Sequence, residues 1–397
     1  MTHREVFLQN VAQTSDFPLA LEIEKAEGIY LYGKNGVKYM DLISGIGVSN
    51  VGHRHPNVVN AIKTQVDKYM HLMVYGEYVQ QPQVLLAQAL AKTLANYRTA
   101  TGYVLDNVYF TNSGTEAVEG AMKLAKRFTG RTEIVSCNRS YHGSTQGALS
   151  LGEEHFRRNF RPLLPAITKI ERNQLIDLEK ITTQTAAVIF EPVGGESGVR
   201  PADEVYLKEL RKRCNEVGTL LIFDEVQSGF GRTGSFWAFE QYDVVPDILL
   251  CAKGMGGGMP IGAFIAPQQI MAVFKDNPIL GHITTFGGHP VSCAASLATL
   301  NTIHDDNLLA EVEKKASLFR ELLVHPAIKE IRHKGLMMAV EFEDFDTLKA
   351  IIDKAISKGV ITDWFLYCDN SMRIAPPLII TEEEIRQACE IILDSIV

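Results

Sequence analysis

The sequence predicts an α/β protein whose larger part is a mostly parallel, seven-stranded sheet. Seven short apolar runs in the middle of the chain lack polar alternation, as expected for strands covered on both faces. Amphipathic stretches of helical length separate these runs, and such alternation is typical of a parallel sheet. The length of 397 residues fits a large domain, expected over residues 51–290, and a small α+β domain formed by residues 1–50 and 291–397.

The predicted elements of the central part follow one another closely. The seven strands are Val108–Thr111, Glu133–Cys137, Ala166–Ile170, Ala186–Glu191, Thr219–Asp224, Ile248–Cys251 and Gly262–Ala266. Amphipathic helices are expected at Thr115–Phe128 and Val205–Val217.

The two ends of the chain have a different pattern. Residues 22–43 predict a short β-meander, because the pair Asn35–Gly36 favours a tight hairpin. After residue 290 the pattern is helical through Leu323. Strands near Gly335–Phe342 and Ser371–Pro376 and a last helix from Glu382 complete the chain.

The composition is that of a globular protein with an acidic surface, since the formal net charge is −8. Such a chain lacks the positive charge that attracts phosphates, so we expect it to bind neither nucleic acid nor anionic membranes. No run approaches the roughly 20 apolar residues that span a bilayer. The first residues also lack the apolar core of a secretory signal.

The six cysteines, at positions 137, 214, 251, 293, 368 and 389, form no C-x-x-C pair. Their wide spacing fits neither a disulfide framework nor a zinc site, so we expect free thiols and a cytoplasmic protein. His53 and His55 precede Pro56 and favour a helix start over a metal site. No bound metal is therefore expected.

Lys253 lies just after the apolar run Ile248–Cys251 and precedes four glycines among residues 254–258. Glycines let the backbone approach a ligand closely. A lysine shielded from water can lose its proton and act as a nucleophile. The alternative is a surface lysine before a flexible loop, and this segment alone favours that alternative slightly.

Asp224 ends a very apolar predicted strand, at the position where parallel sheets bind ligands. A carboxylate there needs a cationic partner because an unpaired buried charge is costly, and a protonated pyridine nitrogen would supply one. The alternative is that Asp224 caps the turn after its strand. For the neighbouring Glu225 we favour such a structural role.

Two further segments lie at predicted strand ends. Ser113, Gly114 and Thr115 start a helix, where N–H groups and hydroxyls can bind an anion or where one hydroxyl merely caps the helix. Tyr141 follows another strand and could stack on a flat aromatic ring, although a core aromatic is equally compatible. The spacing of a P-loop and a dinucleotide fingerprint are both absent.

Taken in order, these segments resemble the class III (ornithine- and acetylornithine-like, ω-amino-acid) aminotransferases, which use pyridoxal 5'-phosphate (PLP) and have fold type I. Eight motifs between residues 52 and 378 match: GHRHP, NSGTEAVEGAMKLAKR, SYHG, EPVGGESG, FDEVQSGFGRTG, AKGMGGGMPIGA, TTFGGHP and RIAPPL. Their common order makes the resemblance highly specific. It implies a fold type I PLP-transferase that works as a homodimer with shared active sites.

The resemblance implies roles for individual residues around the cofactor. Lys253 would hold PLP as a Schiff base and shuttle protons, and Asp224 would pair with the pyridinium nitrogen. Gln227 would hydrogen-bond the ring hydroxyl. Val226 and Tyr141 would pack on opposite faces of the ring.

It also implies how phosphate and substrate are held. The turn at residues 113–115 would bind the phosphate, and Thr285 would reach the phosphate of the neighbouring subunit. Arg373 would bind a substrate carboxylate, since a guanidinium fork suits one. Glu196 would pair with Arg373 as a gate. A surface salt bridge and a loop carboxylate are the alternatives for these two residues, and the family resemblance disfavours both.

One motif departs from the family. In the ornithine and acetylornithine enzymes the segment after the stacking aromatic reads H-G-R-T, and its arginine holds the α-carboxylate of the substrate. Ser144 stands in that place, and a hydroxyl cannot replace a guanidinium. The Y-H-G-S-T form is more similar to the ω-amine and ω-amino-acid:pyruvate transaminases, whereas residues 71–79 have some likeness to the 4-aminobutyrate enzymes. Arg157 or Arg200 could replace the missing arginine from another direction.

We therefore expect PLP-dependent transfer of an amino group from an amine or amino acid, such as an ω-amino acid, to a 2-oxo acid such as pyruvate or 2-oxoglutarate. A PLP-dependent lyase, decarboxylase or aminomutase would use the same lysine and aspartate and is the alternative. A non-catalytic PLP-fold binding protein is disfavoured by the presence of Lys253, Asp224 and Gln227. A nicotinamide dehydrogenase is disfavoured by the missing fingerprint.

Overall fold

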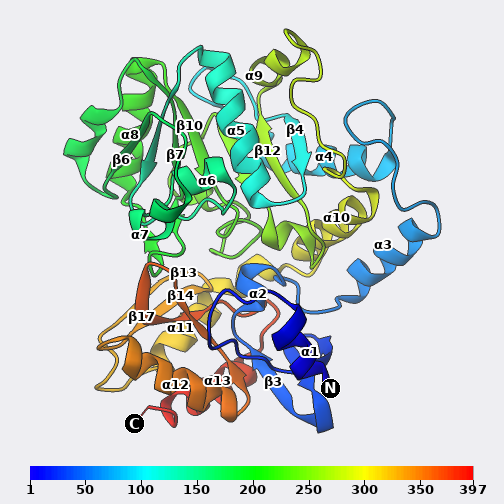
Figure 1. Cartoon of the computed structure of the whole chain (residues 1–397), viewed down its shortest axis with the longest axis vertical. Coiled ribbons are helices and arrows are strands. Elements are labelled where there is room, and N and C mark those ends of the chain that lie inside the picture. Colours follow the sequence, from blue (N-terminus) through cyan, green and yellow to red (C-terminus); the bar gives the residue numbers. More distant parts are fainter. Residues whose placement is uncertain (397) are drawn as a thin grey trace.

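The computed structural model describes residues 1–396, and its central feature is a seven-stranded sheet with the order β4-β12-β11-β10-β7-β5-β6 (Figure 1). The strands are β4 (Asn107–Thr111), β5 (Glu133–Cys137), β6 (Ile167–Ile170), β7 (Thr185–Phe190), β10 (Leu220–Asp224), β11 (Ile248–Cys251) and β12 (Gly262–Ala266). The pairs from β11 to β6 are parallel, while β12 is antiparallel to both of its neighbours. The predicted strands and the mostly parallel sheet are confirmed.

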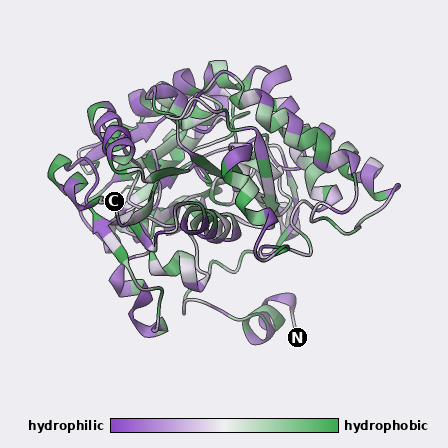
Figure 2. Cartoon of the chain, turned by 90° about the horizontal axis from the view of Figure 1, so that it is seen from above, coloured by the Kyte–Doolittle hydropathy of each residue, from purple (hydrophilic) through white to green (hydrophobic). Residues whose placement is uncertain are grey.

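The strands are apolar throughout because both faces of the sheet are buried. In β10, Leu221 and Phe223 belong to one core and Leu220 and Ile222 to the other. Helix α5 (Gly114–Thr129) covers the second face, whereas α4 (Gln81–Leu94), α8 (Glu204–Val217) and α10 (Pro290–Asp305) bury residues in the first core. Figure 2 shows this layering from above, with hydrophobic residues gathered inside and hydrophilic residues on the outer sides of the helices.

The two ends of the chain meet in a second part of the molecule. One sheet has the order β1-β2-β3-β15 and joins β1 (Ile23–Glu27), β2 (Tyr30–Gly33) and β3 (Lys38–Asp41) to β15 (Val360–Ile361). A second sheet has the order β13-β14-β17-β16, with β13 (Glu330–Lys334), β14 (Met337–Glu341), β16 (Asp363–Phe365) and β17 (Cys368–Ile374). Helices α11 (Val312–Leu322), α12 (Phe345–Ser357) and α13 (Glu382–Leu393) lie beside these sheets (Figure 1). The domain division at residues 50 and 290 stays a prediction.

The predicted β-meander is confirmed, because β1, β2 and β3 pair antiparallel in order and the segment Lys34–Gly36, a 3-10 turn, lies between β2 and β3. The chain after residue 290 differs from the expectation. The helical stretch after residue 290 is broken, because Asn307 adopts a left-handed backbone (φ 50°) between α10 and α11. Helix α3 (Pro56–Val66) does begin at the predicted proline, with His55 accepting a hydrogen bond from the N–H of Asn57.

Helix α1 (His3–Asn10) buries none of its residues and lies at the periphery of the molecule in Figure 2, near residues 20–24. Within residues 1–396, no helix has both the length and the apolar character that crossing a membrane requires. The same residues contain no group of three or more His, Cys, Asp or Glu side chains placed to hold a metal ion. All six cysteines are free thiols.

Candidate active site

The carboxyl ends of the sheet strands surround a cavity of about 500 Å³. Segments that follow β4, β5, β7, β10 and β11 all reach it, because parallel strands end at the same edge of the sheet. The lining includes eight of the residues selected from the sequence: Ser113, Gly114, Thr115, Tyr141, Asp224, Val226, Gln227 and Lys253. Motifs far apart in the sequence therefore form one site.

Asp224 is buried at the end of β10 and has two polar partners. Its Oδ1 accepts a hydrogen bond from the N–H of Val226 (3.0 Å), which is the turn-capping contact, and its Oδ2 lies 2.7 Å from Nδ1 of His142. His142 was not selected from the sequence, although it neighbours Tyr141 at a strand end. The next residue, Glu225, accepts the N–H groups of residues 238 and 239 and so has the expected structural role.

Lys253 begins the turn that follows β11 and has a left-handed backbone (φ 47°), which residues with a side chain rarely adopt. Burial lowers the pKa of its amine below the ordinary 10.5; Glu196 partly offsets this, and Arg373 lowers the pKa further. A lower pKa increases the neutral fraction of the amine, and the neutral amine is the nucleophile.

Helix α5 begins at the cavity, where the first N–H groups of a helix lack helical partners and favour an anion. Ser113 is the N-cap and accepts a hydrogen bond from the N–H of Glu116. Thr115 Oγ1 lies 2.7 Å from Thr145 Oγ1, in the segment that follows β5. A Cβ at Gly143 would lie 2.2 Å from Thr115 Oγ1, so the two segments touch without space for a side chain.

The lining fits PLP. A Cβ at Gly114 would lie 2.9 Å from Cγ1 of Val226, so glycine lets these two segments pack closely. The first N–H groups of α5, beside this contact, lack helical partners and suit a phosphate. Tyr141 and Val226 supply aromatic and apolar surface for a flat ring. Asp224 offers a buried carboxylate to a pyridinium nitrogen, and Lys253 offers an amine with a lowered pKa.

Arg373 of β17 and Glu196 form a buried, bidentate ion pair beside the cavity. Nη1 lies 2.9 Å from Oε1 and Nη2 lies 3.0 Å from Oε2, with both side chains at most 5% exposed. Glu196 also accepts hydrogen bonds from Gln227 Nε2 and from the N–H of Leu366, each 3.2 Å long. Burial raises the pKa of Glu196, but Arg373 outweighs burial and the pKa is lowered to about 2. The pair is therefore ionised near neutral pH.

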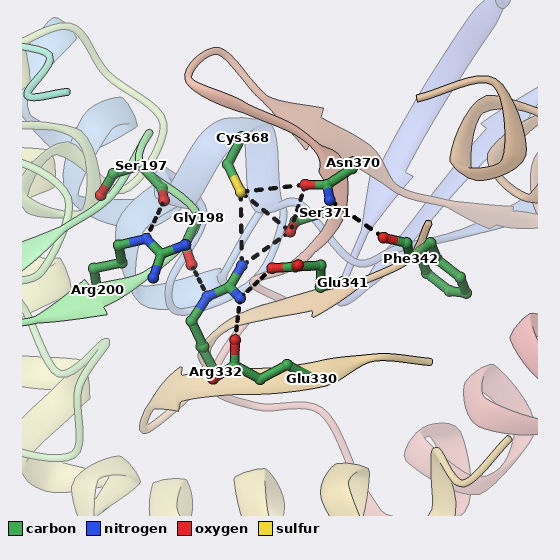
Figure 3. A network of polar contacts seen from close by, with 10 residues as sticks. All are labelled: Ser197, Gly198, Arg200, Glu330, Arg332, Glu341, Phe342, Cys368, Asn370 and Ser371. Carbon is green, nitrogen blue, oxygen red and sulfur yellow. Dashed lines mark hydrogen bonds and ion pairs between the residues drawn. The ribbon is translucent and has the colours of Figure 1, made fainter. Parts of the chain in front are cut away.

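Arg332 of β13 anchors the loop that carries Glu196 (Figure 3). Its Nε donates to the carbonyl of Gly198 (2.8 Å), its Nη2 donates to Ser371 Oγ (2.9 Å), and its Nη1 pairs with a glutamate of β13 and one of β14. Cys368 packs on the same loop, because a Cβ at Gly198 would lie 2.7 Å from its sulfur. The loop is thus fixed to the sheet that carries Arg373.

Glu191 is a further cavity residue that was not selected from the sequence. Glu191 directly follows β7, and Asp224 is the last residue of β10, so both carboxylates lie at strand ends. That position is the signal in the sequence that could have identified Glu191. Its Oε1 accepts the N–H of Gly195 (3.2 Å), and Oε2 has no partner among the described residues. Burial raises the pKa of Glu191, which His142 partly offsets.

Three of the residues considered from the sequence, Thr285, Arg157 and Arg200, do not line the cavity of their own chain. Thr285 is exposed and does not line the cavity. Ser144 does line it, with its Oγ 3.0 Å from the hydroxyl of Tyr141. Arg157 pairs with a nearby glutamate and with a backbone carbonyl, and Arg200 donates to the carbonyl of residue 197. Neither arginine lines the cavity.

Comparisons with known proteins identify the family of the chain. A family model described as aminotransferase class-III matches residues 11–396. The acetylornithine aminotransferases of Methanopyrus kandleri and Caldanaerobacter subterraneus are 41% and 39% identical to the chain. These alignments cover 96% and 93% of this chain and 95% and 93% of the relatives.

Solved structures of transaminases have the same fold. An ornithine aminotransferase from Toxoplasma gondii superposes with a TM-score of 0.90 at 30% identity, covering 99% of this chain and 92% of that one. A transaminase from the marine bacterium Virgibacillus superposes with a TM-score of 0.91 at 26% identity, covering 99% and 98%. Fold and site together define an enzyme that uses PLP.

The chain belongs to the class III aminotransferase family. It is a PLP-dependent transaminase of fold type I that acts on amino donors and 2-oxo acids. The predicted fold, cofactor and reaction class are confirmed.

The contact between Gly114 and Val226 predicts a specific defect. Gly114→Ala should raise the dissociation constant of PLP about tenfold, because the new methyl displaces Val226 and the phosphate turn. Titration of the apoprotein with PLP, followed by absorbance, measures this. The double variant Gly114→Ala/Val226→Ala should recover part of the affinity, since it removes the clash. Equal affinities of Gly114→Ala and wild type would contradict the assignment of this turn.

Proposed function

We propose that this enzyme takes the amino group from a primary amine that has no carboxylate at the Ser144 end of the cavity. The 2-oxo acid acceptor is held by Arg373. The observation that carries the proposal is the distribution of positive charge: among the described residues Lys253 is the only lysine or arginine in the cavity lining, and Arg373 lies beside the cavity, paired with Glu196. A hydroxyl pair, Tyr141 and Ser144, stands where a donor carboxylate would need a guanidinium.

The proposed roles follow from the positions of the side chains. When bound, PLP supplies an electron sink for the negative charge that develops at the donor carbon. Lys253 Nζ takes the proton from that carbon, a general-base role that typically contributes about 10²–10⁴-fold. His142 fixes the orientation of the Asp224 carboxylate, which would pair with the ring nitrogen of PLP.

Substrate exchange is assigned to the ion pair beside the cavity. Glu196 neutralises Arg373 while a donor without a carboxylate occupies the site. The side chain of Glu196 withdraws when a 2-oxo acid brings its own carboxylate to the guanidinium. One cavity can therefore serve two chemically different substrates in turn.

Replacing Lys253 tests the reaction site. Borohydride reduction of the wild-type holoenzyme should fix the cofactor to the peptide that contains Lys253, and mass spectrometry of the digest should detect the added mass. Lys253→Ala should show no such adduct and should lose at least about 10²-fold in turnover. A variant that keeps wild-type turnover would refute this role. Donor added alone should leave an aminated cofactor, whereas a lyase would release product without it.

N-acetylornithine is the second candidate donor, because relatives named acetylornithine aminotransferase are 38–41% identical to this chain. A donor screen with pyruvate and 2-oxoglutarate separates the candidates. We expect amines without a carboxylate at that end to react best with the wild type. Ser144→Arg should raise kcat/KM for N-acetylornithine about tenfold over the uncharged control Ser144→Gln. If the wild type already prefers N-acetylornithine, the proposed donor class is wrong.

We further infer a homodimer in which Thr285 completes the phosphate site of the partner subunit. Large apolar side chains are exposed around it, at Ile279, Leu280, Ile283 and Phe286. Sedimentation should give twice the chain mass of 44.1 kDa. Phe286→Asp should yield monomers with weaker PLP binding, whereas Ile176→Asp, also at an exposed apolar position, should not. A wild-type monomer that keeps its PLP would contradict the dimer.

We also infer that the protein resides in the cytoplasm. The six free thiols support this, because a reducing compartment keeps cysteines unpaired. Native disulfides in protein isolated from its own cells would argue against it.

A further inference from the structure

Arg373 is held by two carboxylates, although one would neutralise its charge. Besides the bidentate pair with Glu196, its Nε donates to Asp363 Oδ1 at 2.8 Å. The carbonyl of Trp364 accepts from Nη2 at 3.2 Å. Every nitrogen of this guanidinium therefore has a partner, and the local charge of the three side chains is −1.

The two carboxylates occupy different edges of the guanidinium. Glu196 takes the end formed by Nη1 and Nη2, whereas Asp363 takes Nε on the side. A carboxylate that replaces Glu196 can bind the same end in the same fork-to-fork geometry. The side at Nε stays occupied throughout such an exchange if Asp363 does not move.

Asp363 is fixed by the sheet. It lies on β16 directly opposite Arg373 on β17, in a paired antiparallel register. The hydroxyl of Thr362 also donates to the carbonyl of Arg373 at 2.6 Å, so the two backbones are joined next to the ion pair. Asp363 cannot leave Nε without breaking this edge of the sheet or rotating its short side chain away from a charge-assisted bond.

Glu196 is the exchangeable partner, and its freedom is confined to the side chain. Its carbonyl accepts the N–H of Tyr367 (3.0 Å), and two residues later Arg332 holds the carbonyl of Gly198 (2.8 Å; Figure 3). With the loop fixed at both points, withdrawal of Glu196 is a rotation of its side chain. The fixed and the exchangeable carboxylates thus belong to different elements.

We propose that Asp363 is a positioning residue and a permanent counter-ion of Arg373. It directs the Nη1–Nη2 end of Arg373 to the substrate and lowers the affinity of Arg373 for carboxylates. This rests on the proposed role of Arg373 in acceptor binding. When a substrate carboxylate displaces Glu196, the neighbourhood contains one more negative charge than before. The charge of Asp363 opposes that addition and keeps the acceptor exchangeable.

The test is binding of glutarate, a dicarboxylate without a reactive carbonyl, to the holoenzyme by isothermal titration calorimetry. Asp363→Asn keeps an acceptor for Nε and removes the charge. It should bind glutarate about three- to tenfold more tightly than wild type. A merely structural salt bridge would give the opposite direction, because a loosened Arg373 binds less well. Equal or weaker binding by Asp363→Asn would therefore overturn the proposal.

Controls separate this inference from the function on which it rests. Asp369→Asn removes the same charge from an exposed position on β17 and should leave the affinity for glutarate unchanged. Arg373→Gln should abolish binding; if it does not, the proposed role of Arg373 fails, whatever Asp363 does.

Asp363→Ser removes the charge without an amide to pack and should bind glutarate more tightly than wild type, as Asp363→Asn does. In turnover, Asp363→Asn should lower KM for the 2-oxo acid and leave KM for an amine donor without a carboxylate unchanged.

The pH profile provides a second measurement. Burial raises the pKa of Asp363 to about 6; Arg373 lowers it in part, while Glu196 and Asp41 raise it further. Asp41 faces it from β3 and itself contacts His53. As pH falls through about 6, Asp363 in the wild type becomes neutral like Asn, so the affinities of wild type and Asp363→Asn should converge. The ionisation of glutarate affects both proteins equally, so it cancels in the ratio of their two dissociation constants. A ratio that stays constant with pH contradicts the counter-ion role.

Discussion

The active site depends on burial of the central sheet on both faces. Polar groups are excluded from the interior of strands such as β7, β10 and β11, so chemistry is confined to the residues where these strands end. Asp224, Glu191 and Lys253 all lie at or just beyond such ends. The sheet thereby brings residues together that are far apart in the sequence, and a single cavity at its edge receives all of them.

The substrate side of the site is held by a different kind of interaction. Arg373, Glu196 and Asp363 come from two strands of a smaller sheet and from a loop of the central part, and charge-assisted bonds join them. A buried ion network is costly unless each member is paired, and here every guanidinium nitrogen has a partner. Arg332 adds a second junction between the same two parts through the carbonyl of Gly198. The cofactor residues are therefore held by the ends of the central strands, whereas the substrate residues are held by charge-assisted bonds between the two parts of the molecule.

The sequence was sufficient for the features that have a local signature. Apolar runs ending in a polar residue located the strands and Asp224, and the glycine-rich turn marked Lys253. His142 and Asp363 were not found, because their importance comes from one contact with a distant residue that no spacing reveals. Asn307 likewise breaks a helical pattern through its backbone conformation alone. For Thr285 the prediction concerns the phosphate of a neighbouring subunit, and a single chain does not contain such a contact.

The pairing of β3 with β15 has a consequence for synthesis of the chain. Residues 38–41 emerge early, yet their neighbour in the sheet is encoded at residues 360–361, near the end. The central sheet, complete by residue 266, needs no such distant partner and can assemble while translation continues. The first strands meanwhile remain an unpaired edge that nascent-chain chaperones can bind. The β3–β15 pair can therefore form only when nearly the whole chain has been synthesised.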